Sequence, residues 1–130
     1  MSRGRNAGAA ILVVEDVEET RDCIQRLLET SGFRVMVARD EIEAALKARM
    51  LPTDLILISI GLDAARTIAV AKRIREHSAR THQTRSQQIP IVLFCVGEPG
   101  DHSPTQIESN IYTIQPDNFD ELRRFLKLLL

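Results

Sequence analysis

An almost unbroken apolar run, residues 54–60, restricts the fold of this chain more than any other segment. Its sequence is Asp-Leu-Ile-Leu-Ile-Ser-Ile, which has the length of a strand and shows no alternation of polar and apolar residues. Such a run is typical of a strand that is buried on both faces of a parallel sheet. Ligands of open α/β sheets bind just outside the carboxyl ends of the strands. The run therefore predicts that Ser59 lies where chemistry is expected.

Four further apolar runs of strand length alternate with patterns typical of helices. Gly32 is expected to end the first helix, and Asp40 with Glu43 has the spacing of a capping box at the start of the second. Ser103 with the proline and glutamine that follow it predicts a short fourth helix. This alternation predicts a three-layer α/β fold of five βα units with a parallel sheet and right-handed crossovers. The predicted strands are residues 9–14, 33–38, 54–60, 89–96 and 111–114.

Length and composition predict one domain, residues 9–130, preceded by a flexible arm, residues 1–8. The net charge is −1, from 17 basic and 18 acidic residues, so the chain has no overall positive field for nucleic acid. Its apolar stretches are shorter than the roughly 20 residues of a membrane span, and no membrane association is expected. The two cysteines, Cys23 and Cys95, lie in apolar patterns. We expect both to be reduced and buried, in a cytoplasmic protein.

The loop after the first strand has no glycine but contains four acids, among them Glu15 and Asp16. Nucleotide sites at this position need glycine-rich loops, and the negative charge here would repel a phosphate group. Paired acids at a strand end suit a hard cation such as Mg²⁺. The same acids would also cap and stabilise the first helix. Taken alone, the residues leave both interpretations open.

In these segments the chain resembles a response-regulator receiver domain of two-component signalling, over nearly its whole length. Residues 11–16 (Ile-Leu-Val-Val-Glu-Asp) resemble the first strand of the family and its acidic pair, and residues 54–59 resemble its third strand. Residues 89–95 resemble the fourth strand, and residues 112–116 (Tyr-Thr-Ile-Gln-Pro) resemble the fifth. The resemblance implies a flavodoxin-like fold with the strand order 2-1-3-4-5. It also implies a cis peptide bond before Pro116.

The departures from the family pattern fall on its chemistry. Ser59 stands where the family has its phosphoacceptor aspartate, which is also a ligand of Mg²⁺. Cys95 replaces the Thr or Ser that senses the phosphoryl group, and Gln115 replaces the lysine that pairs with it. The resemblance therefore implies a degenerate pseudo-receiver with no catalytic residue, no required cofactor and weak Mg²⁺ binding, if any, at Glu15 and Asp16. No enzyme activity is expected.

The predicted function is an atypical receiver domain that binds a protein partner in a signalling pathway and is not phosphorylated at the usual site. Tyr112, at the family's aromatic switch position, is the predicted interaction residue. A homodimer is left open as a second kind of partner. Two alternatives remain: residual phosphoryl chemistry at Ser59, for which the sequence names no general base, and a receiver that is one portion of a larger transcriptional regulator.

Overall fold

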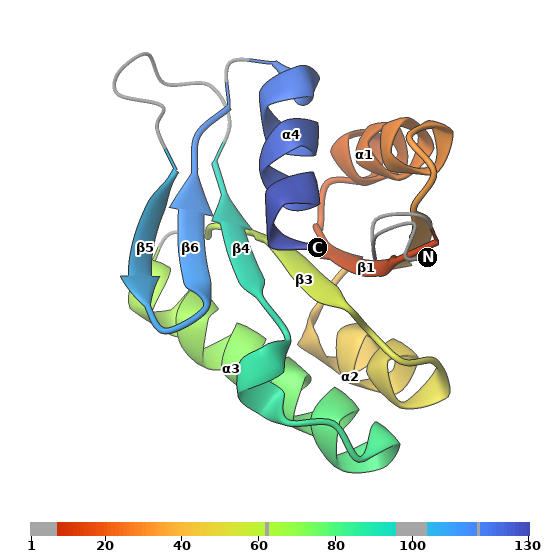
Figure 1. Cartoon of the computed structure of the whole chain (residues 1–130), viewed down its shortest axis with the longest axis vertical. Helices are drawn as coiled ribbons and strands as arrows, with labels where there is room; N and C mark the ends of the chain where they lie inside the picture. Colours follow the sequence, from red (N-terminus) through yellow and green to blue (C-terminus); the bar gives the residue numbers. More distant parts are fainter. Residues whose placement is uncertain (1–7, 62, 96–103, 117) are drawn as a thin grey trace, which may run out of the picture.

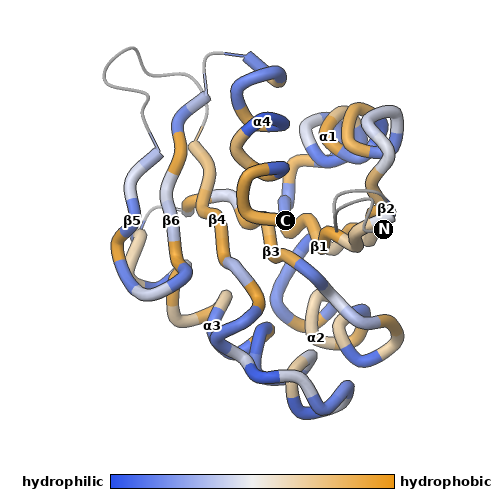
Figure 2. The backbone as a smooth tube through the Cα atoms, viewed as in Figure 1, coloured by the Kyte–Doolittle hydropathy of each residue, from blue (hydrophilic) through white to orange (hydrophobic). Residues whose placement is uncertain are grey.

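The computed structural model describes residues 8–61, 63–95, 104–116 and 118–130, which form a six-stranded sheet with helices on both faces (Figure 1). The apolar segments of the sequence coincide with the central strands, and the polar residues gather on the outer turns of the helices (Figure 2). The elements in chain order are β1 (Ala10–Val14), α1 (Glu18–Thr30), β2 (Arg34–Ala38), α2 (Glu41–Met50), β3 (Leu55–Ser59), α3 (Ala64–His82), the 3₁₀ turn η1 (Ser86–Gln88), β4 (Ile91–Phe94), β5 (Thr105–Glu108), β6 (Ile111–Ile114) and α4 (Phe119–Leu129).

The strand order is β2-β1-β3-β4-β6-β5, and the first five strands in this order run parallel. The prediction of a flavodoxin-like α/β fold with the parallel order 2-1-3-4-5 is confirmed, because β6 is the strand expected at residues 111–114. The central strand β3 is buried along its length up to Ser59, as its unbroken apolar run predicts. Parallel strands covered by helices on both faces require such runs.

The short fourth helix expected from residue 103 onward is wrong. Residue 103 lies outside the described residues, and Thr105–Glu108 forms the edge strand β5, antiparallel to β6. Asn110 adopts a left-handed conformation, with φ of 59°, at the turn between these two strands. Asparagine tolerates that conformation, and the segment before the turn has room for no more than about one turn of helix. Turn formation at Asn110 therefore prevails over the capping pattern.

Two apolar clusters hold the three layers together. Helices α2 and α3 cover one face of the sheet, where Ala48 and Ile74 pack against Ile56 of β3. Helices α1 and α4 cover the other face (Figure 1). There Leu28 and Leu126 pack against the strand residues whose side chains point to that face, such as Leu57 of β3. The carboxyl ends of the parallel strands consequently meet at one edge of this sandwich, where ligands of such sheets bind.

The predicted helix signals at α1 and α2 are confirmed. Gly32 follows α1 with φ of 99°, a conformation that glycine adopts without steric cost. The Asp40 side chain accepts a hydrogen bond of 2.9 Å from the Glu43 backbone N–H, and the Glu43 carboxylate accepts one of 2.8 Å from the Arg39 backbone N–H. The first bond is the N-cap bond of a capping box, and the second differs from the standard box because Glu43 accepts from the residue before the N-cap.

Two further expectations are wrong. Both cysteines are free, but Cys23 is exposed and Cys95 is half-buried. Cys23 directly precedes the buried Ile24 on α1. Successive residues of an α-helix point about 100° apart around its axis, so the side chain of Cys23 lies outside the core. No cis peptide bond occurs among the described residues, so the bond before Pro116 is trans; an X–Pro bond adopts trans unless its surroundings favour cis. No helix in the described part of the chain is long and apolar enough to cross a membrane.

Candidate functional site at the carboxyl edge of the sheet

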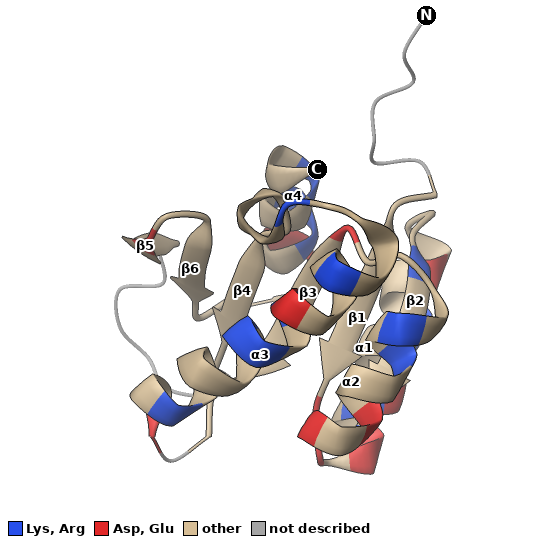
Figure 3. Cartoon of the chain, turned by 90° about the horizontal axis from the view of Figure 1, so that it is seen from below, with Lys and Arg blue, Asp and Glu red and all other residues tan. Residues whose placement is uncertain are grey.

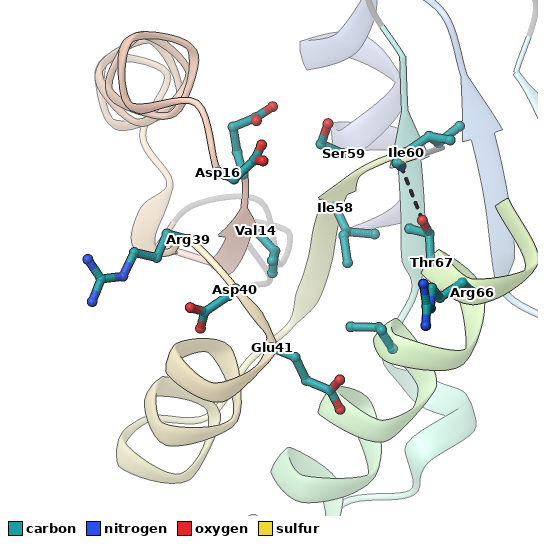
Figure 4. A pocket seen from close by; sticks show the side chains of 13 residues that line it. Val14, Asp16, Arg39, Asp40, Glu41, Ile58, Ser59, Ile60, Arg66 and Thr67 are labelled. Atoms are coloured by element: carbon teal, nitrogen blue, oxygen red, sulfur yellow. Dashed lines mark hydrogen bonds between the residues drawn. The ribbon is translucent and has the colours of Figure 1, made fainter. Parts of the chain in front are cut away.

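A hollow of about 290 Å³ opens at the carboxyl edge of the sheet, above β1 and β3. The pairing of Val14 with Ile58 brings the ends of these two strands side by side, although they are far apart in the sequence. Glu15 and Asp16 follow β1, and Ser59 ends β3, so all three line this hollow (Figure 4). The structure therefore brings together the acidic pair and the serine that the sequence singles out.

Glu15 is the buried member of the acidic pair, with 5% of its surface exposed. Burial raises the pKa of its carboxyl, which the interaction with the neighbouring Asp16 raises further. Hydrogen bonds from the Val17 backbone N–H, at 2.9 Å, and from the Ser59 hydroxyl act in the opposite direction and lower that pKa. Because the first effect is the largest, the Glu15 carboxyl is harder to ionise than an exposed glutamate.

Ser59 is half-buried and lies beside the Glu15 carboxyl. Its hydroxyl is neutral and donates one proton, so it cannot supply the negative charge of a carboxylate at this strand end. A serine becomes a nucleophile when a neighbouring base accepts its proton. The sequence names no base for Ser59; in the structure the nearest candidate is the Glu15 carboxyl beside it.

Several residues of the hollow are not anticipated by the sequence. Thr67 of α3 accepts a hydrogen bond of 3.2 Å from the Gly61 backbone N–H, which holds the loop after β3 against the helix (Figure 4). Arg39 also lines the hollow, but its side chain extends away from Ser59 (Figure 4). These residues lie directly after predicted strands or in the first turns of the helices that follow. Their position at the carboxyl edge of the sheet could therefore have identified them as lining residues from the sequence. The remaining lining residues from the loops and helices are Asp40, Glu41, Ile60, Arg66 and Val70.

The other predicted site residues lie at the neighbouring strand ends. Cys95 follows β4 and is half-buried, and its backbone N–H donates a hydrogen bond of 3.1 Å to the Ile114 carbonyl of β6. Gln115 follows β6 and is half-buried. Neither residue is among the described residues that line the hollow around Ser59.

Tyr112 is held on β6 by two interactions. Its ring packs edge-to-face on Phe125 of α4, with ring centroids 5.5 Å apart, and its hydroxyl donates to the Asn110 side chain at 3.3 Å. The ring is half-buried, so part of it remains available to a partner.

The residues at this edge do not fit a tightly bound Mg²⁺ ion. The strand ends beside Ser59 supply one exposed carboxylate, Asp16, one buried carboxyl with a raised pKa, Glu15, and the neutral hydroxyl of Ser59. The other two carboxylates of the hollow are already engaged, since Asp40 caps α2 and Glu41 pairs with Arg73. No group of three or more potential ligands from His, Cys, Asp and Glu occurs in the described part of the chain. Mg²⁺ dehydrates reluctantly and needs near-ideal octahedral oxygen ligation. We therefore assign no chemical step to a metal ion here.

Comparison with known proteins places this arrangement in context. The model of the response regulator receiver domain family matches residues 11–101. The sensor histidine kinase AruS of Pseudomonas aeruginosa is 31% identical over 118 residues, which are 89% of this chain and 11% of that protein. The chain thus spans about a tenth of the length of this curated relative.

Solved structures of receiver domains share the fold. The chemotaxis protein CheY4 of Vibrio cholerae superposes with a TM-score of 0.69 and 22% identity, over 95% of this chain and 100% of that chain. The receiver domain of the hybrid histidine kinase CckA gives 0.67 and 23%, over 94% and 99%. TrrA of Thermotoga maritima, crystallised with Mg²⁺ and BeF, gives 0.66 and 23%, also over 94% and 99%. Another structure contains TrrA in complex with the histidine kinase ThkA.

Proposed function

Because this chain belongs to the response regulator receiver domain family, we propose that it is an atypical receiver that binds a signalling partner without being phosphorylated at the usual site. Receiver domains are signalling modules of two-component systems rather than classical enzymes. The finer proposal is carried by one observation: the central strand β3 ends in Ser59, a neutral hydroxyl, beside the buried Glu15.

The packing of the fold supports this proposal. The residues of β1, β3 and β4 form intact buried strands, whereas the side chains at their carboxyl ends lack a third carboxylate within the described residues. A phosphodonor can shift a conformational equilibrium only if it interacts differently with the two states. Without an aspartate at position 59, acetyl phosphate and beryllofluoride have no carboxylate to bond at this strand end.

The test compares the amide NMR spectrum of the protein with and without beryllofluoride and Mg²⁺. We expect no change beyond the effects of the salts alone. The receiver TrrA, which has been crystallised with Mg²⁺ and BeF, serves as the positive control. A saturable spectral change that is lost in Ser59→Ala would contradict the proposal and identify Ser59 as the acceptor, and a change that is retained would contradict it by assigning the acceptor to another residue.

A second candidate function, residual phosphoryl transfer to Ser59, is favoured by the position of the Ser59 hydroxyl beside the Glu15 carboxyl, whose pKa it lowers. In this reaction the Ser59 oxygen forms a bond to the phosphorus of a small-molecule phosphodonor, and the bond between that phosphorus and the leaving oxygen breaks. The ionised Glu15 carboxylate accepts the hydroxyl proton. The raised pKa of Glu15 makes it a better proton acceptor once it is ionised, since a stronger base has a higher pKa.

Mass spectrometry after incubation with acetyl phosphate separates the two candidates. The atypical, non-phosphorylated receiver gives no phosphoserine at position 59. Stoichiometric phosphoserine that is lost in both Ser59→Ala and Glu15→Gln would establish the second candidate in place of the first. The variant Asp16→Asn is a matched control, because it changes the exposed neighbour and leaves the Ser59–Glu15 contact in place.

The proposal includes a protein partner in a signalling pathway and a receiver unit formed by residues 9–130, with residues 1–8 as an arm outside it. AruS, which is far longer than this chain, suggests that such a receiver can act as one portion of a larger regulator. Affinity capture from native cells tests the partner, with Tyr112→Ala as the variant and Phe33→Leu, a conservative core change remote from the site, as a control for general destabilisation. Equal capture by Tyr112→Ala and the wild type would exclude Tyr112 from the interface.

A further inference from the structure

Helix α2 carries an apolar stripe on the face that points away from the sheet. Ile42, Leu46 and Met50 follow one another at intervals of four residues, and 83%, 56% and 64% of their respective surfaces are exposed. Residues four apart on a helix lie on the same face. The buried face of the helix is formed instead by small residues, Ala44, Ala45 and Ala48. The largest apolar side chains of α2 are therefore turned toward solvent and not toward the core.

Such a stripe is unusual for a surface helix, whose outer face is normally polar. Leu51, directly after the helix, is also half exposed at 50% and extends the stripe at its carboxyl end. Contiguous exposed apolar residues bordered by charges mark interaction surfaces more often than single exposed residues do.

We propose that this stripe is the interface of a homodimer, in which α2 of one copy packs antiparallel against α2 of a second copy about a two-fold axis. In such an isologous interface the same residues are used by both copies. Leu46 lies at the axis and meets Leu46 of the second copy, and Ile42 lies opposite Met50. The assembly does not depend on the chemistry at Ser59, so it goes beyond the proposed function.

The distribution of charge selects a second copy in this orientation. Acidic residues, Glu41 and Glu43, occupy the first turn of α2, where Arg73 and Arg39 of the same chain pair with them. Basic residues, Lys47 and Arg49, occupy the last turn, and no ion pair within the described residues neutralises them (Figure 3). Antiparallel packing places the acidic end of each helix beside the basic end of the other, and the two helix dipoles also oppose each other. A parallel arrangement would juxtapose like charges, which is unfavourable. The charges of α2 therefore match those of a second α2 in the antiparallel orientation but not in the parallel one.

The shape of the surface favours the same partner. A hollow of about 370 Å³ lies beside the stripe between α2 and α3, and Ile42, Leu46 and His77 are among its lining residues. In the antiparallel arrangement Met50 of the second copy approaches Ile42 and reaches this hollow. Methionine is flexible and fills irregular gaps well. The two-fold axis repeats this contact on the other side.

The dimer is expected to be weak, because one helix per copy is its whole interface. A stable interface buries about 800 Å² per partner, and a stripe of four apolar residues supplies less than that. Dissociation constants in the range of about 10 μM to about 1 mM are expected. The monomer and dimer should therefore interconvert within the concentration range of a sedimentation experiment.

Sedimentation velocity over a series of concentrations tests the interface. We expect a reversible monomer–dimer equilibrium that Ile42→Glu weakens at least about 10-fold, since it buries a charge against apolar residues. The matched control is Leu128→Glu on α4, because Leu128 is also 83% exposed but lies outside the stripe. The equilibrium of this control should equal that of the wild type. The proposal is overturned if the wild type stays monomeric up to about 1 mM, or if Ile42→Glu still forms the dimer. The stripe would then be a binding surface for another protein or for a lipid surface.

Cysteine cross-linking tests the orientation in a Cys23→Ser background, with the linked peptides identified by mass spectrometry. Leu46→Cys should link to itself at the axis. Ile42→Cys should not, because eight residues of helix separate position 42 from position 50, about 12 Å along the axis. A mixture of Ile42→Cys and Met50→Cys should form the mixed disulfide. Self-linking of Ile42→Cys without the mixed product would indicate parallel packing and overturn the proposal. Because these variants keep the stripe apolar, the cross-linking result does not depend on whether a glutamate is tolerated there.

Discussion

The hydroxyl of Ser59 at the end of β3 lies beside the carboxyl of Glu15, which follows the neighbouring strand β1, and lowers the pKa of that carboxyl. Burial raises the pKa of Glu15 by more than the Ser59 hydroxyl lowers it, so the folded protein holds this proton more tightly than the unfolded chain does. A glutamate of this kind contributes to a dependence of stability on pH that can be measured.

The variant Glu15→Gln should reduce the loss of stability that accompanies rising pH. The pKa of Glu15 is raised above its ordinary value of 4.5, so between that value and the folded pKa the folded protein binds more protons than the unfolded chain. The contribution of Glu15 to stability is then largest at low pH and is lost as the pH rises through this window. Urea denaturation midpoints between about pH 4 and about pH 8 measure the effect.

Glu41→Gln is the control with the opposite sign. Two hydrogen bonds from Arg73, of 2.6 and 2.9 Å, hold the pKa of Glu41 below its ordinary value. Its contribution is present above the unfolded pKa and is lost as the pH falls, so Glu41→Gln should lower stability at neutral pH. Equal pH profiles of the wild type and Glu15→Gln would show that the Glu15 carboxyl does not titrate as the structure indicates.

Magnesium should bind weakly at the carboxyl edge, with a dissociation constant of about 1 mM or weaker. Glu15 and Asp16 provide two carboxyl groups, and Ser59 adds no charge. Isothermal titration calorimetry measures the affinity, with Asp16→Asn as the comparison. A tight stoichiometric site that is abolished by Asp16→Asn would contradict this expectation.

The single change Ser59→Asp should not restore full switching by phosphorylation. It places a third carboxylate beside Glu15 and Asp16, whose mutual repulsion should lower stability without a cation and make Mg²⁺ stabilising. It leaves the neutral Gln115 and the thiol of Cys95 at the neighbouring strand ends. Acetyl phosphate labelling and the amide spectrum of the variant measure acceptor activity and shape change separately.

The triple variant Ser59→Asp, Cys95→Thr, Gln115→Lys is the matched positive control for this experiment. It adds the hydroxyl and the positive charge that the family pattern has at these positions. Normal phosphorylation together with a normal conformational change in Ser59→Asp alone would refute the prediction.

Replacing Arg75 of α3 by Met should leave the stability of the protein unchanged or raise it by about 1–2 kcal/mol. The residue is buried, and its Nε and Nη1 atoms have no hydrogen-bond partner in the described part of the chain. Burial lowers the pKa of its guanidinium accordingly. Methionine retains a long flexible side chain and removes the buried charge.

Arg73→Met, two positions earlier on α3, is the control for Arg75→Met. Arg73 is paired with Glu41 of α2, so its loss should lower stability. Thermal or urea denaturation measures the free energy of unfolding of both variants relative to the wild type. A large destabilisation by Arg75→Met would mean that its guanidinium has a partner in solution.

The parallel core could be predicted from the sequence because burial on both faces demands unbroken apolar runs. Residues 54–60 and the other strand-length runs carry that requirement directly. The edge of the sheet could not be predicted in the same way. Thr105–Glu108 is exposed throughout, so it shows no apolar pattern, and the conformation of Asn110 rather than burial determines that it is a strand.

The candidate site was predicted in its members but not in its interactions. The sequence places Glu15, Asp16 and Ser59 at strand ends, and parallel pairing then brings them together. It does not reveal which acid is buried, because Glu15 and Asp16 are adjacent and chemically similar, and only their opposite directions in the folded chain distinguish them. The exposure of Cys23 was missed for a related reason, since it depends on a single residue step around α1.

The edge strand also bears on how the protein folds. Strands β5 and β6 are joined by a two-residue turn and pair antiparallel, whereas each parallel pair needs a long crossover to close first. Hairpins form in about 1–10 μs, and sheets with distant pairing partners assemble much more slowly. The ion pair of 2.6 Å between Lys72 and Glu108 then joins the hairpin to α3. This end of the sheet is therefore expected to acquire its structure from local contacts, ahead of the parallel strands that bear the candidate site.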